Sequence, residues 1–271
     1  MGNVSGVLIL TIAIGVCIGS FLNVLIYRLP RGLGFVKGRS FCPTCKRKIN
    51  WFDNVPLISF VLLKGRCRFC HSPISWRYPV VELTTALLTL LIFNYKFLII
   101  NQFLNLNFQT VFDLVSYLFL VWGLIVIFFI DLEHQIIPDE IILPLIALFF
   151  FRQLFLFFSL SPITYHLSPI FSAIGASLFL LLIYVSTKGR GMGLGDVKLA
   201  FLMGLVLGFP KIIVAFYIAF LTGAFVGIIL ILGKYAKFGQ KIAFGPFLVL
   251  STLITFLWGE KILSLVLKVL L

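Results

Sequence analysis

Two aspartates, Asp131 and Asp196, stand at the edges of apolar segments in a chain that has only nine Asp and Glu among 271 residues. Asp131 follows the apolar run LFLVWGLIVIFFI, and Asp196 ends the glycine-rich turn GMGLGD. Ionisable side chains at membrane depth are costly, so those that occur there usually have a function. Two paired carboxylates can share a proton and activate water. The pair therefore predicts an intramembrane aspartyl protease with Asp131 and Asp196 as its catalytic acids.

Simpler interpretations exist for both aspartates, and neighbouring residues offer other chemistry. Either carboxylate could cap a helix N-terminus, as Asp196 would for the next apolar segment, without any catalytic role. In the stretch DLEHQIIPDE, Asp139 follows Pro138 and is expected as a first-turn acid, which the helix dipole favours. His134 is expected to be a solvated loop residue, with the role of general base as the alternative. The sequence contains no HExxH and no GxSxG motif, which argues against a zinc metalloprotease and a serine hydrolase.

Four of the five cysteines form two C-x2-C turns separated by 21 residues: Cys42, Cys45, Cys67 and Cys70. Two such turns can supply the tetrahedral ligands of one zinc ion, and a closed four-sulfur site is structural. The alternative is a pair of disulfides, which rarely persist in the cytoplasm. His71 could replace one thiolate, although a surface position is the simpler expectation. Cys17 lies inside the first apolar run and is expected to be a small packing residue.

The composition is that of a membrane protein. Hydrophobic residues make up 61% of the chain and charged residues 11%, whereas soluble domains are about one quarter charged. The predicted fold is an all-α polytopic membrane protein of about eight transmembrane helices. The expected domains are a first transmembrane helix (1–27), a small cytoplasmic zinc-binding loop domain (28–78) and a transmembrane aspartyl protease core (79–271). One segment, Leu199 to Phe209, is short for a span and is expected to be truncated or re-entrant.

Basic residues set the predicted orientation. The region from Arg28 to Tyr78 holds eleven Lys and Arg and one acid, Asp53, which places it in the cytoplasm by the positive-inside rule. Counting along eight spans then assigns 17 of the 22 Lys and Arg to cytoplasmic loops and puts both aspartates, Asp131 and Asp196, at that face. Basic loops also attract anionic lipids, so membrane lipid is a predicted partner. No nucleic-acid-binding motif is present, and no nucleic-acid partner is expected.

These motifs carry a resemblance to a known family. The segments GSFLNVLIYRLP, DLEHQIIPDE, GMGLGDVKLA and FGPFL, with the long cysteine-containing block, make the chain resemble the bacterial type IV prepilin peptidases over nearly its whole length. These enzymes are also called leader peptidase–methyltransferases and are intramembrane aspartyl proteases of the GxGD type. The two catalytic aspartates of the family fall on Asp131 and Asp196. Ala243 stands before FGP, where a proline is common, and we expect little consequence.

The resemblance implies an aspartic endopeptidase and a second activity. Members of the family cut the basic leader from type IV prepilins and pseudopilins, which serve type IV pili and type II secretion. Cleavage takes place at the cytoplasmic face of the bacterial inner membrane, after a glycine and before a long apolar helix. Members with the four-cysteine domain then methylate the new N-terminus with S-adenosylmethionine. Glu82 and Arg77, which flank the segment RYPVVE, are candidates for contact with the methyl donor or substrate, or for a juxtamembrane ion pair.

Two other function classes compete with the protease. A polytopic ion- or proton-coupled transporter could use the buried aspartates, but it has no need of the cysteine module, and the chain shows no inverted repeat. A membrane scaffold with a partner-binding zinc ribbon would leave both aspartates without a role.

Overall fold

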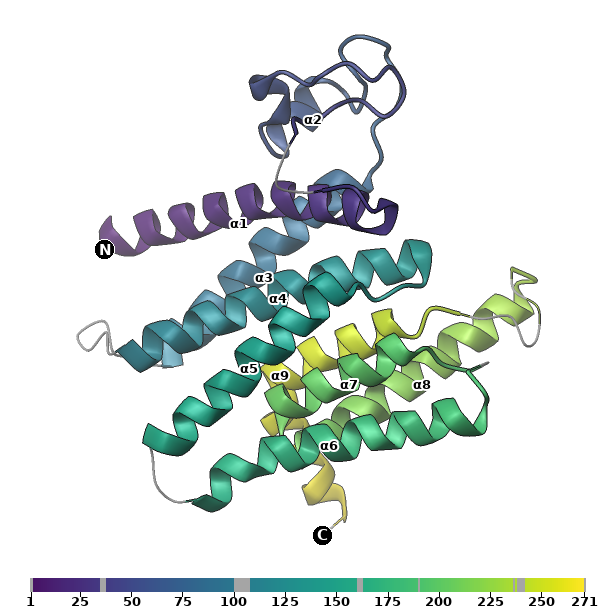
Figure 1. Cartoon of the computed structure of the whole chain (residues 1–271). Helices are drawn as coiled ribbons and strands as arrows, with labels where there is room; N and C mark the ends of the chain where they lie inside the picture. Colours follow the sequence, from purple (N-terminus) through teal and green to yellow (C-terminus); the bar gives the residue numbers. More distant parts are fainter. Residues whose placement is uncertain are drawn as a thin grey trace. The chain divides into compact units, whose positions relative to one another are not determined.

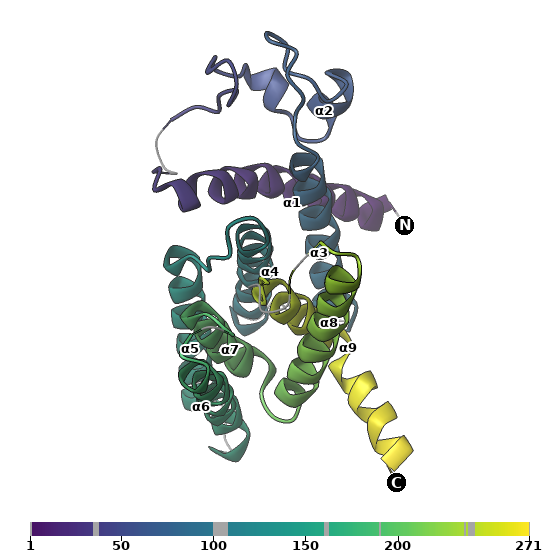
Figure 2. The same ribbon diagram turned by 90° about the vertical axis from the view of Figure 1, so that its right-hand side faces the viewer.

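The computed structural model describes residues 2–34, 38–99, 108–159, 163–189, 191–235, 237 and 242–270. Within these residues the chain is helical and has no named strand, which confirms the all-α prediction (Figures 1 and 2). Three of the basic residues counted for the orientation, Lys37, Arg190 and Lys241, lie outside the described residues. The helices are α1 (Gly2–Arg28), η1 (Leu29–Arg31), η2 (Trp51–Asn54), α2 (Ile58–Leu62), α3 (Arg77–Ile99), α4 (Phe108–His134), α5 (Asp139–Ser159), α6 (Ile163–Ser186), α7 (Leu194–Leu207), α8 (Lys211–Leu232) and α9 (Gly245–Leu270).

Two compact units make up the chain, and the boundary falls inside α4. The N-terminal unit comprises Met1–Val126, and the C-terminal unit comprises Ile127–Leu271. The division into domains 1–27, 28–78 and 79–271 stays a prediction.

Six helices in the described part of the chain are long and apolar enough to cross a membrane, so the protein is a multi-pass membrane protein. They are Gly6–Arg31, Phe108–His134, Asp139–Phe157, Ser168–Ser186, Lys211–Leu232 and Gly245–Leu265. The helices α3 and α7 lie at the other two predicted spans but are not among these six. With 14 residues, α7 is about 21 Å long, less than the roughly 30 Å of a bilayer core. The count of eight spans stays a prediction.

In the N-terminal unit, two glycines let α1 and α3 pack backbone to backbone. A Cβ atom on Gly15 would lie 2.6 Å from the Cα of Ala86, and one on Gly19 would lie 2.7 Å from the Cα of Glu82. Glycines four residues apart share one helix face, as in the GxxxG contacts of membrane helices.

The prediction that Cys17 is a packing residue is wrong, because the side chain is exposed. Two residues from each glycine, it lies on the side of α1 that faces away from α3.

The core of the C-terminal unit is the short helix α7, which contacts α5, α6, α8 and α9. Its buried apolar residues cover most of its surface: Leu199, Ala200, Leu202, Met203, Leu205 and Leu207. A Cβ on Gly204 would lie 2.3 Å from the Cα of Ala173 in α6, so this glycine is required for the close crossing. Because α7 is enclosed by longer helices, it does not have to reach across the bilayer itself.

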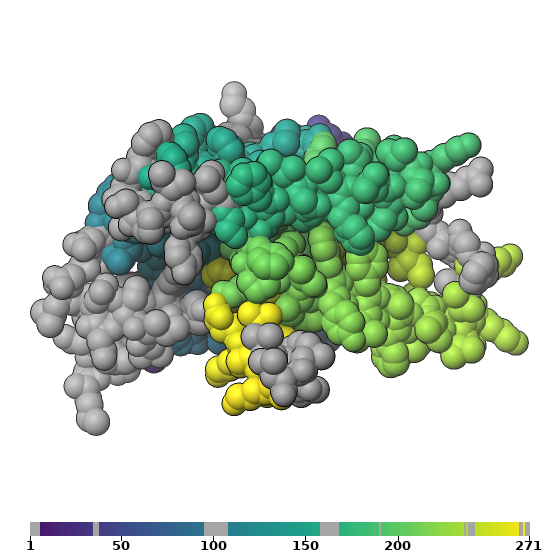
Figure 3. Space-filling model, turned by 90° about the horizontal axis from the view of Figure 1, so that it is seen from below, coloured from purple at the N-terminus to yellow at the C-terminus, as the bar shows by residue number. Residues whose placement is uncertain are grey.

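On one face of the C-terminal unit, α6 and α8 lie side by side (Figure 3). The ring of Phe179 in α6 contacts Phe216 and Phe220 in α8, with centroid separations of 5.6 and 6.2 Å. Phe220 in turn stacks against Phe244, at 5.1 Å, just before α9 begins. The aromatic contacts thus connect the outer helices to the residue that precedes Gly245.

Replacing Gly204 with leucine should destabilise the C-terminal unit. The new side chain would meet the α6 backbone, and overpacking of this kind costs about 1–3 kcal/mol, which corresponds to a fall in apparent Tm on the order of 5 °C. Gly175→Leu is the matched control, because a Cβ at Gly175 meets nothing within 4 Å. Thermal unfolding of the purified protein in detergent measures both variants. Equal melting temperatures would contradict the central packing role of Gly204.

Candidate active site and metal centre

Asp131 lies in the last turn of α4, with its side chain buried against the first residue of α9. Only 5% of the residue is exposed. The backbone amide of Gly245 hydrogen-bonds to its carboxylate, and a Cβ on that glycine would lie 2.5 Å from Oδ2. This Oδ2 atom is buried and has no hydrogen-bond partner among the described residues. The carboxylate therefore has one oxygen atom still available for a reacting group.

Asp196 occupies the third position of α7 and is 8% exposed. The alternative that Asp196 is the N-cap is wrong, because Gly193 holds that position in an extended conformation and α7 begins at Leu194. The Gly193 N–H donates to Asp196 Oδ2 over 2.9 Å. Asp196 therefore does cap the helix through its own carboxylate, which makes the acidic half of a capping box, while Gly193 has no side chain to make the other half. Capping and catalysis are compatible, because Gly193 leaves further lone pairs of the carboxylate available.

Both carboxylates belong to the C-terminal unit and lie close enough for their charges to act on each other. Each accepts a hydrogen bond from a glycine amide at the start of a helix, where the helix dipole favours negative charge. Two interacting carboxyl groups titrate as a pair and not one by one. A pair of this kind is suited to general acid and general base catalysis, in which one carboxyl group is ionised and the other is protonated. The structure thus brings together the two aspartates that the sequence singled out.

Close contacts hold the segments that carry the aspartates. A Cβ on Gly195 would lie 2.9 Å from the Cβ of Ile137, so the loop after α4 packs directly on the turn before Asp196. Asp139 begins α5, as predicted, and its Oδ1 accepts a hydrogen bond from Lys198 Nζ over 2.6 Å. The only signal for Lys198 in the sequence is its position two residues after Asp196.

The predicted role of His134 as a solvated loop residue is only partly right. His134 ends α4 and is half-buried, and its Nε2 atom lies 3.9 Å from Glu133 Oε2. The carboxylate that lies beside this Nε2 atom is therefore that of Glu133 and not that of either aspartate.

The four cysteines Cys42, Cys45, Cys67 and Cys70 meet in the N-terminal unit. Their sulfur atoms all lie within 4.8 Å of one another, and they could hold a metal ion. Cys42 Sγ lies 3.8 Å from Cys70 Sγ, which is about the separation of two sulfurs bound tetrahedrally to one zinc ion at 2.3 Å. A disulfide bond is about 2.05 Å long, and all four cysteines are free in this structure. His71 is exposed and is not a member of the cluster.

Both C-x2-C turns have the same local geometry. The N–H of the residue after the second cysteine, Lys46 or His71, donates to the carbonyl of the first cysteine over 2.9 and 3.0 Å. Each of these two residues has a positive φ, of 59° and 54°. The reversal of the chain at Lys46 and His71 points both sulfurs of a turn to one place. The repeated geometry is what a shared ligand requires of two separate turns.

The pKa values of the cysteine thiols are also consistent with a bound cation at this cluster. Burial raises the pKa of the Cys42 thiol, but hydrogen bonds from the backbone of Cys45 and Thr44 outweigh it and lower that pKa to about 6. The backbone of Arg47 lowers the pKa of Cys45, yet burial and the adjacent Cys42 and Cys70 thiols raise it to about 11. Four thiolates cannot ionise together without a counter-charge, and a bound dication supplies it.

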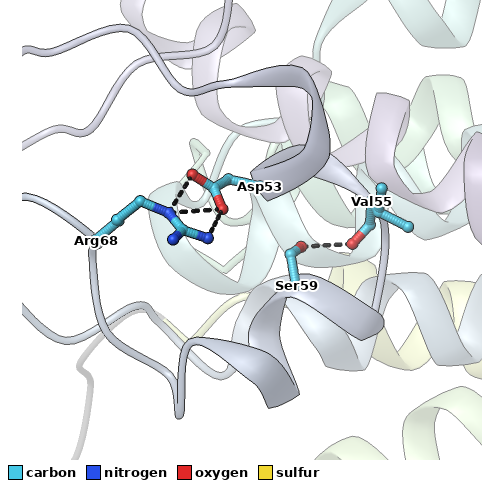
Figure 4. Close-up of polar contacts among 4 residues, drawn as sticks. All are labelled: Asp53, Val55, Ser59 and Arg68. Carbon is cyan, nitrogen blue, oxygen red and sulfur yellow. Dashed lines mark hydrogen bonds and ion pairs between the residues drawn. The ribbon is translucent and has the colours of Figure 1, made fainter.

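An ion pair braces the cysteine domain (Figure 4). Asp53, in η2, accepts hydrogen bonds from Arg68 Nε at 3.0 and 2.9 Å and from Nη2 at 2.6 Å. Because Arg68 lies between Cys67 and Cys70, the pair ties η2 to the second cysteine turn. In the same domain the Ser59 hydroxyl donates to the Val55 carbonyl. Nothing in the local sequence around Asp53 identifies this partner, which lies 15 residues away.

Glu82 connects this domain to α3. It is buried at 6% exposure, and its Oε2 accepts a hydrogen bond from the Leu57 N–H over 2.8 Å. The carboxylate therefore fixes the residue before α2, and this contact accounts for its burial. The suggested contact of Glu82 and Arg77 with a methyl donor or substrate stays a prediction.

Comparison with known proteins assigns the chain to a family. Residues 118–228 match the type IV leader peptidase family, and residues 13–96 match the bacterial peptidase A24 N-terminal domain. The prepilin leader peptidase/N-methyltransferase of Pseudomonas aeruginosa is 32% identical over 93% of this chain and 90% of its own length. The chain belongs to the type IV leader peptidase family. The proteins of the same name from Aeromonas hydrophila and Legionella pneumophila are 34% and 33% identical, over 90% and 91% of this chain and 88% and 90% of their own lengths. No solved structure matches the chain.

The two family segments coincide with the two sites. Residues 118–228 contain Asp131 and Asp196, and residues 13–96 contain the four cysteines and the glycines that join α1 to α3. The resemblance stated from the motifs is therefore confirmed at the level of the family.

Gly245→Ala should reduce leader peptidase activity about 100-fold. The added methyl group would stand 2.5 Å from Asp131 Oδ2, and a displacement of about 1 Å at a reacting group can cost that factor. Gly227→Ala is the control, because its nearest contact would be 3.9 Å away. Cleavage rates of a leader-bearing substrate compare the two variants. Full activity of Gly245→Ala would contradict the close contact described at Asp131.

Proposed function

We propose that this protein is a bifunctional prepilin leader peptidase/N-methyltransferase. It cleaves the basic leader from type IV prepilins and pseudopilins and methylates the new N-terminus with S-adenosylmethionine as donor. The observation that carries the peptidase assignment is the pair of buried carboxylates, Asp131 and Asp196, which act on each other within the family segment. The family match gives no support to the alternative of a transporter.

Peptide hydrolysis follows from the two carboxylates. The substrate arrives as an apolar helix with its scissile bond at the membrane edge. The ionised aspartate takes a proton from water, and the resulting hydroxide attacks the peptide carbonyl carbon. The protonated aspartate donates its proton to the carbonyl oxygen, which gives a neutral tetrahedral intermediate. The aspartate that took the proton from water then donates it to the leaving nitrogen. As the carbon–nitrogen bond breaks, the other aspartate takes back a hydroxyl proton, and a carboxylic acid and an amine leave. The amides of Gly193 and Gly245 keep each carboxylate oriented without supplying or removing a proton.

The metal at the cysteine cluster is zinc with a structural role in this proposal. Four sulfur ligands leave no open coordination position for a substrate or water. A loop domain of this size has too small an apolar core to be stable without a metal ion or another cross-link. Zinc would therefore fix the two cysteine turns on which the rest of the domain is built.

The proposed setting is the bacterial inner membrane, with the cysteine domain and both aspartates at the cytoplasmic face. The excess of basic residues between Arg28 and Tyr78 supports this orientation. We also propose the functional division into the first helix, the cysteine domain of residues 28–78 and the protease core of residues 79–271. Membrane lipid and prepilins are the proposed partners, and nucleic acid is not.

Asp131→Asn and Asp196→Asn should each abolish leader cleavage, with a loss of at least about 1,000-fold, because an amide can neither accept nor donate the required proton. Asparagine keeps the shape and the capping ability of aspartate, so each protein should remain folded. Cleavage of a purified prepilin by the reconstituted variants is the measurement. Turnover within a few-fold of the parent in either variant would exclude an aspartyl protease.

The same variants separate the two activities. A pilin that already lacks its leader needs no proteolysis, so the aspartate variants should still methylate it at close to the parent rate. Transfer of a radioactive methyl group from S-adenosylmethionine provides this readout. Loss of both activities in a folded variant would instead place them at one shared centre.

One zinc ion per chain should copurify with the protein, and Cys70→Ser should lower that content to less than about half, because one of four ligands is lost. Cys17→Ser serves as the control, since Cys17 is exposed and outside the cluster. Elemental analysis and the rate of thiol alkylation follow both variants. A parent protein with no stoichiometric metal and rapidly alkylated thiols would rule out the zinc site.

A further inference from the structure

Between Trp51 and Trp76, the cysteine domain carries seven large apolar side chains that are exposed. Trp51 is 78% exposed, Trp76 is 74% exposed and Leu62 is 75% exposed. We call the whole set the aromatic surface, and it comprises Trp51, Phe52, Ile58, Val61, Leu62, Phe69 and Trp76. Several large exposed apolar side chains in one small, basic domain are typical of an interaction site.

Contacts within the domain hold these residues on one framework. Helix α2, which carries the aliphatic members, packs against η2, which begins with Trp51. The Trp76 ring lies 5.1 Å from Phe60 of α2. The ion pair between Asp53 and Arg68 fixes η2 to the second cysteine turn (Figure 4). The members of the aromatic surface are therefore linked to one another by contacts within the domain.

Positive charge accompanies the apolar side chains. The guanidinium of Arg68 lies 5.3 Å from the centre of the Phe52 ring, and that of Arg47 lies 5.2 Å from the Phe69 ring. From Arg28 to Tyr78 there are eleven Lys and Arg and one acid. That acid, Asp53, is occupied by Arg68. A partner that fits this surface is apolar and negatively charged at once.

The helices to which the cysteine domain is joined indicate which apolar and negatively charged partner lies within its reach. Its N-terminal end continues from α1, a candidate membrane span, and its C-terminal end leads into α3, which packs along α1. Glu82 in α3 also holds the Leu57 amide, directly before α2. The domain is therefore tethered at both ends to this helix pair, one member of which is a candidate membrane span. Tryptophan and aliphatic side chains beside basic residues match the interfacial layer of a membrane with anionic lipids.

We propose that the aromatic surface docks on the anionic head-group layer of the bilayer, with its exposed apolar side chains inserted among the lipids. This interaction does not depend on either enzymatic activity. It would hold the four-cysteine centre at the depth where a membrane-anchored substrate presents its polar end.

The test uses the full chain in nanodiscs that contain brominated lipid, which quenches tryptophan by direct contact. The contribution of Trp51 and Trp76 is the difference between the parent and the variant Trp51→Phe/Trp76→Phe. We expect these two residues to be quenched in discs with anionic lipid and at least about twofold less in neutral discs or in about 0.5 M salt, where screening is strong.

Matched acidic substitutions test the surface itself. Leu62→Glu should reduce the quenching of Trp51 and Trp76 at least twofold, because a carboxylate is repelled by anionic lipid. Leu232→Glu, at the end of α8, is the control with the same chemistry, since Leu232 is 77% exposed. Unchanged metal content shows that both variants keep the folded cysteine domain.

Three results would overturn the proposal. In the first, Trp51 and Trp76 are fully open to aqueous acrylamide and insensitive to brominated lipid. In the second, their quenching is the same in neutral and anionic discs. In the third, they become protected only as protein concentration rises, which would make the aromatic surface an interface between copies of the chain.

Discussion

The C-terminal unit is arranged around two buried carboxylates whose charges interact, those of Asp131 and Asp196. Each charge is costly in such a place unless hydrogen bonds and dipoles compensate it. Glycine amides at the starts of α7 and α9 supply that compensation for Asp196 and Asp131. The geometry needs a backbone without a side chain at these positions, since a Cβ on Gly245 would strike the Asp131 carboxylate. The helix N-termini and their glycines therefore serve the same purpose, which is to stabilise a buried carboxylate.

Close backbone contact is also how the helices of each unit pack. Gly15 and Gly19 let α1 meet α3, and Gly204 lets α7 meet α6. Apolar burial gives little drive to association between helices already surrounded by lipid, so packing of small residues becomes important. Enclosing α7 in this way permits a helix too short to span a bilayer, and its start carries Asp196. The same close fit makes Gly204 intolerant of larger side chains.

The cysteine domain solves a different problem. It is polar and basic, it has few buried apolar residues, and its two cysteine turns bring four sulfur atoms within 4.8 Å of one another. Its large apolar side chains lie on the outside and not in a core. Trp51 and Trp76 are among them, in a domain whose two ends both continue into paired helices.

The sequence by itself determined the helical membrane class, the family, the four-cysteine cluster and the two aspartates, because hydropathy, ligand spacing and rare buried acids are local signals. Only the tertiary structure decided what surrounds them. Gly245 lies 114 residues from Asp131 in the sequence, and Lys198 lies 59 residues from its partner Asp139. Pairings over such distances depend on how helices cross. The exposed position of Cys17 has the same cause, because the glycines beside it determine which face of α1 meets α3.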